Sequence, residues 1–232
     1  MVNKNTIKVT NQSGAQQHYA IFNKPPIVTG KVSGQIWSNV FATANTPKSN
    51  SANFSIFKQY YAVVGTSQGN PEQGVQVDVN GSRDVTLGST QPNGAAVAGT
   101  TLKLLVQDDA PQFSDEALPN GSFPNAFEIR TSSDFTLQDA RNGNYVIGLG
   151  GTKNGNSVDG PAATFVPEPN VQYQIQPSNT YYLTVGDYTK GSLIDVTKIG
   201  GTILTIDFTA YPSGAVSVVH TDRGELVIQV QN

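Results

Sequence analysis

The chain has 232 residues, of which 37% are hydrophobic and 13% are charged, and its net charge at neutral pH is −3. Its 14 Lys and Arg residues are scattered among 17 acids, so no nucleic-acid partner is expected, because phosphate backbones need clustered basic residues. Because the chain has no cysteine and no apolar run of about 20 residues, we expect neither disulfides nor membrane insertion.

Hydrophobic and polar residues alternate along much of the first half of the chain, as in β-strands with one buried face. The alternating segments there are residues 6–10, 54–57, 74–79 and 101–107. Pro111, Pro119 and Pro124 then interrupt the pattern. Because proline cannot donate to a strand ladder, residues 111–124 are predicted to be a long connection.

The second half of the chain returns to the same alternation. Its segments are residues 127–131, 171–176, 192–196, 202–208 and 226–230. Between them, residues 133–142 predict one short helix with Asp134 as its N-cap. Residues 148–160 are rich in glycine and predict a long exposed loop. The turn residues 221–224 predict a hairpin between residues 215–220 and 225–231.

These segments together predict an all-β protein, folded as an antiparallel β-sandwich or jelly roll. Residues 54–69 and 173–191 share an order of landmarks: an aromatic residue, Ile, Tyr-Tyr and Val-Gly. One interpretation is two similar β halves, residues 1–110 and 125–232, joined by the Pro-rich connection 111–124. The alternative is one continuous domain.

Aromatic residues beside amides are the candidate ligand contacts. Each of two Tyr-Tyr pairs puts one ring on each face of a strand, so one ring of each pair turns away from a one-sided core. Exposed rings stack on sugars while amides bond their hydroxyls, although rings covered on both faces would simply be core. The candidate ligand-binding residues are Trp37, Asn39, Tyr60, Tyr61, Tyr181 and Tyr182.

Catalytic chemistry has weaker signals. His18 and His220 are the only histidines, and Glu128 lies on the strand face opposite Phe127 and Ile129. If the protein is an enzyme, Glu128, His18 and His220 are its candidate acids and bases. Neither a Gly-x-Ser-x-Gly elbow nor closely spaced metal ligands occur, so we expect no metal and no cofactor.

The leading hypothesis is a non-catalytic, lectin-like protein that recognises carbohydrate or a similar small polar ligand. Its cysteine-free, Asn-, Thr- and Gly-rich composition is similar to that of microbial lectins. One alternative is a small-molecule enzyme with an acid–base pocket between sheets. Another is a structural or assembly subunit, such as a homo-oligomer whose exposed strands pair between chains. Residues 1–10 lack the apolar core of a signal peptide, so we expect a cytoplasmic protein or non-classical export.

Overall fold

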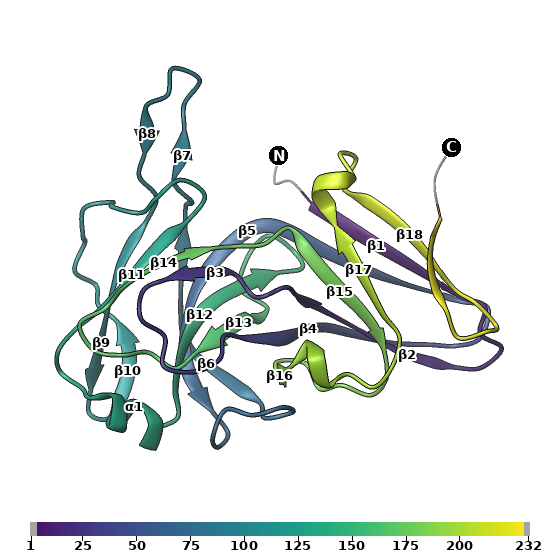
Figure 1. Cartoon of the computed structure of the whole chain (residues 1–232), viewed down its shortest axis with the longest axis horizontal. Helices are drawn as coiled ribbons and strands as arrows, with labels where there is room; N and C mark the ends of the chain where they lie inside the picture. The colour runs from purple at the N-terminus through teal and green to yellow at the C-terminus, as the bar shows by residue number, and fades with distance from the viewer. Residues whose placement is uncertain (1–3, 230–232) are drawn as a thin grey trace.

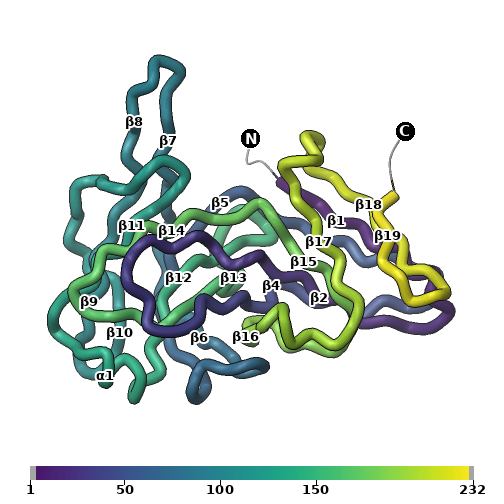
Figure 2. Tube along the Cα trace, in the orientation of Figure 1, coloured from purple at the N-terminus to yellow at the C-terminus, as the bar shows by residue number. Residues whose placement is uncertain are grey.

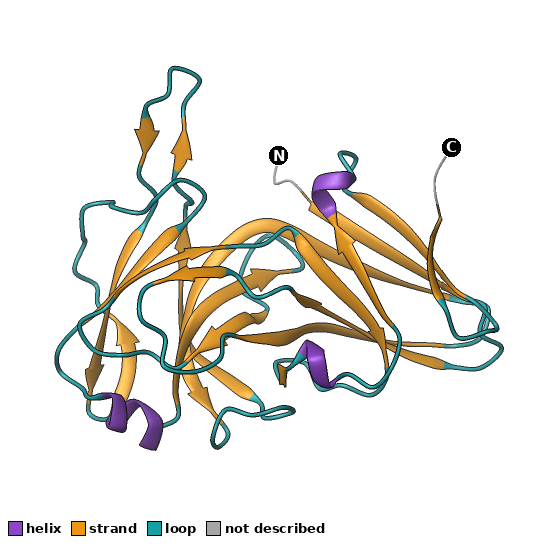
Figure 3. Cartoon of the chain, viewed as in Figure 1, coloured by secondary structure: helices purple, strands orange, loops and turns teal. Residues whose placement is uncertain are grey.

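The computed structural model describes residues 4–229, and β-strands make up nearly all of its regular structure (Figures 1 and 3). The strands are β1 (Lys4–Asn11), β2 (Gln17–Asn23), β3 (Ile27–Thr29), β4 (Trp37–Thr46), β5 (Ser51–Ser67), β6 (Val77–Val85), β7 (Ser89–Thr90), β8 (Ala96–Val97), β9 (Thr101–Gln107), β10 (Ala110–Phe113), β11 (Phe127–Thr131), β12 (Tyr145–Thr152), β13 (Gly160–Phe165), β14 (Gln172–Gln176), β15 (Thr180–Val185), β16 (Leu193–Ile194), β17 (Ile203–Asp207), β18 (Ala215–His220) and β19 (Leu226–Gln229). The helical segments are α1 (Leu137–Asn142) and the 3-10 turns η1 (Val196–Lys198) and η2 (Phe208–Ala210). The all-β prediction is confirmed.

Two sheets contain most of the strands. The larger has the order β17-β15-β2-β4-β13-β12-β5-β1-β18-β19, with β16 also paired to β4 and β6 to β5. The smaller has the order β10-β9-β11-β14-β3, and the hairpin β7–β8 stands away from the body (Figure 2). Most pairs are antiparallel, but β1–β18 and β9–β11 are parallel. The larger sheet is curled, and its edge strands β17 and β19 contact each other. The sandwich or jelly-roll arrangement stays a prediction.

Strand β5 has 17 residues and runs through two hydrophobic cores. Its first half contributes Ala52, Phe54 and Ile56 to the core inside the curled part of the larger sheet. Its second half contributes Ala62 and Val64 to the core between the larger and smaller sheets. The side chains alternate between faces, as the strand period requires. One continuous strand therefore connects the two cores.

Several strands and the last hairpin follow the sequence prediction closely. Alternation over residues 101–107 and 127–131 gave the bounds of β9 and β11. The hairpin around residues 221–224 is present as β18 and β19, with Thr221 N donating to Glu225 O at 2.9 Å. Residues 230 and 231 of its predicted second strand lie outside the described residues.

The short helix is present, but Asp134 is not its N-cap. Thr136 takes that position, because its hydroxyl accepts from the Asp139 N–H while the Asp139 carboxylate accepts from the Thr136 N–H. This reciprocal capping box satisfies two backbone donors at once. Asp134 instead accepts a hydrogen bond from the Val106 N–H. The helix therefore begins later than the sequence indicated.

The predicted glycine-rich loop is wrong at both ends, because Gly148 to Thr152 lie in β12 and Gly160 begins β13. A Cβ on Gly148 would meet the Ala163 carbonyl oxygen at 2.1 Å, and one on Gly150 would meet the Val63 side chain at 2.6 Å. These glycines allow neighbouring chains to approach closely inside a sheet. Their composition resembles that of a loop, but their role is packing.

The two proposed halves interleave. Strand β5 pairs with β12 and β1 pairs with β18, so partners from either side of residues 111–124 share the larger sheet. Residues 54–69 lie mainly in the single strand β5, whereas residues 173–191 include β15 and most of β14, in different sheets. The duplication and the division into halves stay predictions. No helix within residues 4–229 is both long enough and apolar enough to cross a bilayer.

Candidate functional site

A groove of about 290 Å³ lies where four connecting segments meet. The β3–β4 connection and the start of β4 form one wall, and the turn after β5, the last turn of α1 and the residue after β13 form the rest. Its lining residues are Ser33, Gly34, Gln35, Trp37, Asn70, Pro71, Arg141 and Val166. Trp37, the predicted ligand contact, is therefore part of a concave surface, where small-molecule sites occur.

Trp37 is the first residue of β4 and is held firmly. It packs with Val77, Val146 and Leu193 and is only 8% exposed. Its indole N–H donates to no acceptor within residues 4–229. In that part of the chain the only fully buried side-chain nitrogen or oxygen without a partner is Ser122 Oγ, so the indole N–H is not fully buried. A buried ring with an open donor offers a ligand one hydrogen bond in a fixed position.

Three further polar side chains at the groove are available to a ligand. Gln35, Asn70 and Arg141 make no side-chain hydrogen bond and no ion pair to any other residue that the structure describes. Each amide offers a donor and an acceptor, and the guanidinium offers five donors. Ala140 is fully buried against the core between the sheets, which fixes α1 and so the backbone of Arg141. The groove therefore presents hydrogen-bonding groups from three separate segments.

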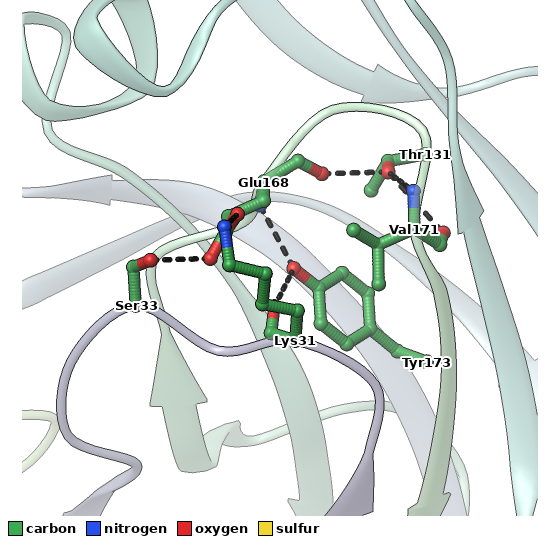
Figure 4. Close-up of polar contacts among 6 residues, drawn as sticks. All are labelled: Lys31, Ser33, Thr131, Glu168, Val171 and Tyr173. Atoms are coloured by element: carbon green, nitrogen blue, oxygen red, sulfur yellow. Dashed lines mark hydrogen bonds and ion pairs between the residues drawn. The ribbon is translucent and has the colours of Figure 1, made fainter.

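Glu168 binds the β3–β4 connection, which forms one wall of the groove, and Figure 4 shows the polar contacts of Glu168. Its side chain is 7% exposed, and its carboxylate pairs with Lys31 Nζ at 2.9 Å and accepts a hydrogen bond from Ser33 Oγ. The Glu168 N–H donates to the Tyr173 hydroxyl at 2.8 Å, and that hydroxyl donates to the Lys31 carbonyl at 3.0 Å. Thr131 Oγ1 donates to the Glu168 carbonyl at 2.6 Å. The network ties the β3–β4 connection to β11 and β14.

The ion pair of this network lies beside the groove, and Arg141 is the one charged residue of the groove lining. Hydrogen bonds from Lys31 and Ser33 lower the pKa of Glu168, the charges of Lys31 and Arg141 lower it further, and burial opposes them. Glu168 is therefore ionised at neutral pH and neutralises Lys31. Burial raises the pKa of Tyr173 to about 12, so its hydroxyl keeps its proton. Arg141 forms no ion pair with a carboxylate between residues 4 and 229.

Three of the predicted ligand-binding residues are buried or partly buried and do not line the groove. Asn39 is fully buried, where its Oδ1 accepts from Thr164 Oγ1 and its Nδ2 donates to Gly191 O, both at 3.0 Å. Tyr61 is 4% exposed, and the partly buried Tyr182 packs against a neighbouring aromatic ring. The amide of Asn39 holds β4 in place and is not part of the groove.

Tyr60 and Tyr181, one from each Tyr-Tyr pair, meet at a small cavity near the boundary of the two cores. Asn23 and Gln59 also line this cavity, whose volume of about 10 Å³ suits one water molecule. Burial raises the pKa of both tyrosines. The structure therefore brings two predicted residues together, but in a space too small for a sugar.

Glu128, a candidate acid or base, lies buried in β11 of the smaller sheet. Its carboxylate forms an ion pair with Arg130 and accepts a hydrogen bond from Gln174. A carboxylate engaged in this way is satisfied within the sheet and is not directed into the groove, whose lining does not include it. The ion pair and the hydrogen bond satisfy the buried carboxylate, as buried polar groups generally require.

The two histidines lie in different surroundings. His18 is half exposed in β2 and contacts the exposed Asp187. His220 is buried in β18, where its Nδ1 and the Tyr19 hydroxyl share a hydrogen bond of 3.0 Å. Neither lines the groove. Glu128, His18 and His220 therefore each contact different partners.

Of the groove residues, the sequence identified only Trp37. Gln35 stands two residues earlier, a spacing that could have pointed to it, because residues i and i+2 share a face of an extended chain. Asn70 follows a long strand and Arg141 lies in the last turn of a short helix, so only the folded chain brings them together. Glu168 had no signal, since the ion pair that fixes it joins distant segments.

The comparisons with known proteins bear on the whole chain. No curated protein and no solved structure shows significant similarity to it. The RhiA family matches residues 3–231, which is nearly the full length and includes every residue of the groove. The chain belongs to the RhiA family.

Proposed function

We propose that this protein is a non-catalytic, lectin-like binding protein whose groove takes a saccharide or a similar small polar ligand. The main supporting observation is that one groove of about 290 Å³ is lined by four side chains with unused hydrogen-bonding groups. They are Trp37, Gln35, Asn70 and Arg141. Small-ligand sites start at roughly 300 Å³, so the volume suits one or two sugar rings. Amides and an indole N–H match the alternating donors and acceptors of sugar hydroxyls.

The rigidity of the groove supports the proposal. Glu168 holds the β3–β4 connection through Lys31 and Ser33, and Trp37 is packed into a small cluster of its own. Binding costs less free energy when the contacting groups are already ordered.

The assembly alternative has one observation in its favour. Ile27 lies on β3, an edge strand of the smaller sheet, and its side chain is 66% exposed. Edge strands with exposed apolar side chains can pair between chains. Light scattering of the purified protein tests this alternative, since an assembly subunit has a mass several times that of the 24.6 kDa chain.

The binding proposal is tested with a glycan array followed by calorimetric titration of the glycans it retains. Trp37 is the only tryptophan, so its fluorescence reports directly on the groove. Asn70→Ala should weaken binding roughly three- to tenfold, the effect of one hydrogen bond. Trp37→Phe should weaken it similarly while keeping an aromatic ring in the cluster.

The control is Asn179→Ala, an exposed asparagine before β15 that is not part of the groove lining. It should bind like the unchanged protein. The proposal fails if no glycan binds, or if Asn70→Ala and Trp37→Phe both bind with unchanged affinity.

A further inference from the structure

The groove lining contains one charged side chain, that of Arg141. Lys31 is neutralised by Glu168 at 2.9 Å. Arg141, in the last turn of α1, has neither a carboxylate partner nor a side-chain hydrogen bond within residues 4–229. Arg141 lines the groove together with Ser33, whose hydroxyl donates to the Glu168 carboxylate.

The planar shape of the Arg141 guanidinium limits the chemical class of the ligand further. A guanidinium presents parallel N–H donors in a planar fork, which fits the two oxygens of a carboxylate. The surrounding groups, the amides of Gln35 and Asn70 and the indole N–H of Trp37, are neutral and suit hydroxyls. The groove therefore combines one anion site with several hydroxyl sites.

We propose that the natural ligand is an acidic saccharide of the uronic acid class, whose carboxylate binds the Arg141 guanidinium while its hydroxyls bind Gln35, Asn70 and Trp37. This inference rests on the proposed function and adds the ligand's charge and the residue that recognises it. Arg141 is then the specificity-determining residue, because it distinguishes an acidic sugar from its neutral counterpart.

A carboxylate fits the charge of the groove better than a phosphate does. A phosphate monoester carries nearly two negative charges at neutral pH and is bound by several cations or backbone N–H groups. Here Arg141 is the only lining residue with a charged side chain. One free positive charge matches one negative charge.

The test compares matched sugars by Trp37 fluorescence and calorimetry: galacturonate with galactose, and glucuronate with glucose, as monosaccharides and disaccharides. The acidic member of each pair should bind at least about tenfold more tightly, the effect of one charge-assisted hydrogen bond. Raising the salt concentration should weaken only the acidic member, because salt screens exposed charges. Galactose 6-phosphate should bind less tightly than galacturonate.

Two variants test whether Arg141 causes the preference for the acidic sugar. Arg141→Gln should abolish the preference for the acidic sugar, so that the acidic and neutral members of each pair bind with equal affinity. Arg141→Lys keeps the charge without the planar fork and should lose most of the preference. Arg223→Gln, an exposed arginine in the turn before β19, is the matched control and should behave like the unchanged protein.

The outcomes separate this inference from the proposed function. If neutral sugars bind as tightly as acidic ones, or if Arg141→Gln keeps the preference, the proposal of an acidic ligand is wrong. The proposal of a saccharide site is then unaffected. Tighter binding of the phosphate sugar also overturns it. If neither acidic nor neutral sugars bind, the proposed function fails with it.

Discussion

His220 is buried against Tyr19, with the two rings edge to face at 5.7 Å between centroids and a hydrogen bond of 3.0 Å between Nδ1 and the hydroxyl. Burial lowers the pKa of His220 below its ordinary value, since a charged imidazole is poorly solvated there. The same burial raises the pKa of Tyr19 to about 12, so its hydroxyl stays neutral. This pair therefore favours the neutral histidine.

This burial makes the stability of the protein depend on pH. Below pH ~6.5 the unfolded chain binds a proton at His220 that the folded protein does not, so the free energy of unfolding falls as pH falls. His220→Gln removes this contribution and should flatten the dependence between pH 7.5 and 5.5 by up to ~1.4 kcal/mol per pH unit. Urea unfolding at several pH values measures it, and equal slopes for both proteins would contradict the assignment.

Single residues also show how far the sequence could predict the site. Trp37 was singled out as a lone tryptophan among amides, and it does line the groove, while its contact with a ligand stays a prediction. Arg141 was not a candidate, because only the folded structure shows that it lines the groove and has no carboxylate partner within residues 4–229. Asn39 looked the same as a ligand-binding amide in sequence, yet it is fully buried and bonded at both ends.

The β3–β4 connection is the element on which the groove depends. Glu168 reaches it from the β13–β14 connection, bonding Lys31 and Ser33 on either side of Val32. Because these bonds favour the ionised carboxylate, the pKa of Glu168 is lowered. Its contribution to stability is then complete above its unfolded pKa near 4.5 and is lost as pH falls through the lower folded value.

Glu168→Gln should loosen this connection, because the amide keeps the size of the side chain but loses the ion pair. The free energy of unfolding should fall by about 1–2 kcal/mol at neutral pH, and the difference from the unchanged protein should narrow in acid. Hydrogen exchange should speed up in residues 30–36 and saccharide affinity should drop. Glu225→Gln, an exposed acid in the last hairpin, is the control. Unchanged exchange in residues 30–36 would show that Glu168 does not hold the groove.

The elements that were predicted well are those for which a two-residue period decides between core and solvent. Strands β9 and β11 have the bounds that alternation gave. Residues 148–152 of strand β12 were mistaken for a loop because the glycines carry no side chain that could alternate. They are required by the neighbouring strands, since a Cβ on Gly148 would meet a carbonyl oxygen of β13 at 2.1 Å. Contacts of that kind are invisible in a single sequence.

At the scale of the whole molecule, the two cores share strands. β5 contributes Phe54 to the core of the curled part and Val64 to the core between the sheets. It pairs along its length with β1, β6 and β12, which come from both sides of residues 111–124. The order of strands in sequence therefore says little about which of them pair, and this is why period-two alternation alone predicted the class of fold but not its arrangement.

Shared strands predict that the two cores unfold together. Ile21 lies in the first core and Ile129 in the second, and both are fully buried. Ile21→Ala and Ile129→Ala should each lower the free energy of unfolding by about 2–5 kcal/mol while leaving a single transition. Far-ultraviolet circular dichroism and Trp37 fluorescence should follow that transition with the same midpoint. Ile27→Ala, at a site that is 66% exposed, should change the free energy by less than about 0.5 kcal/mol. If Ile21→Ala instead separates the two signals into two steps, β5 does not couple the cores, and two independently unfolding cores become the better description.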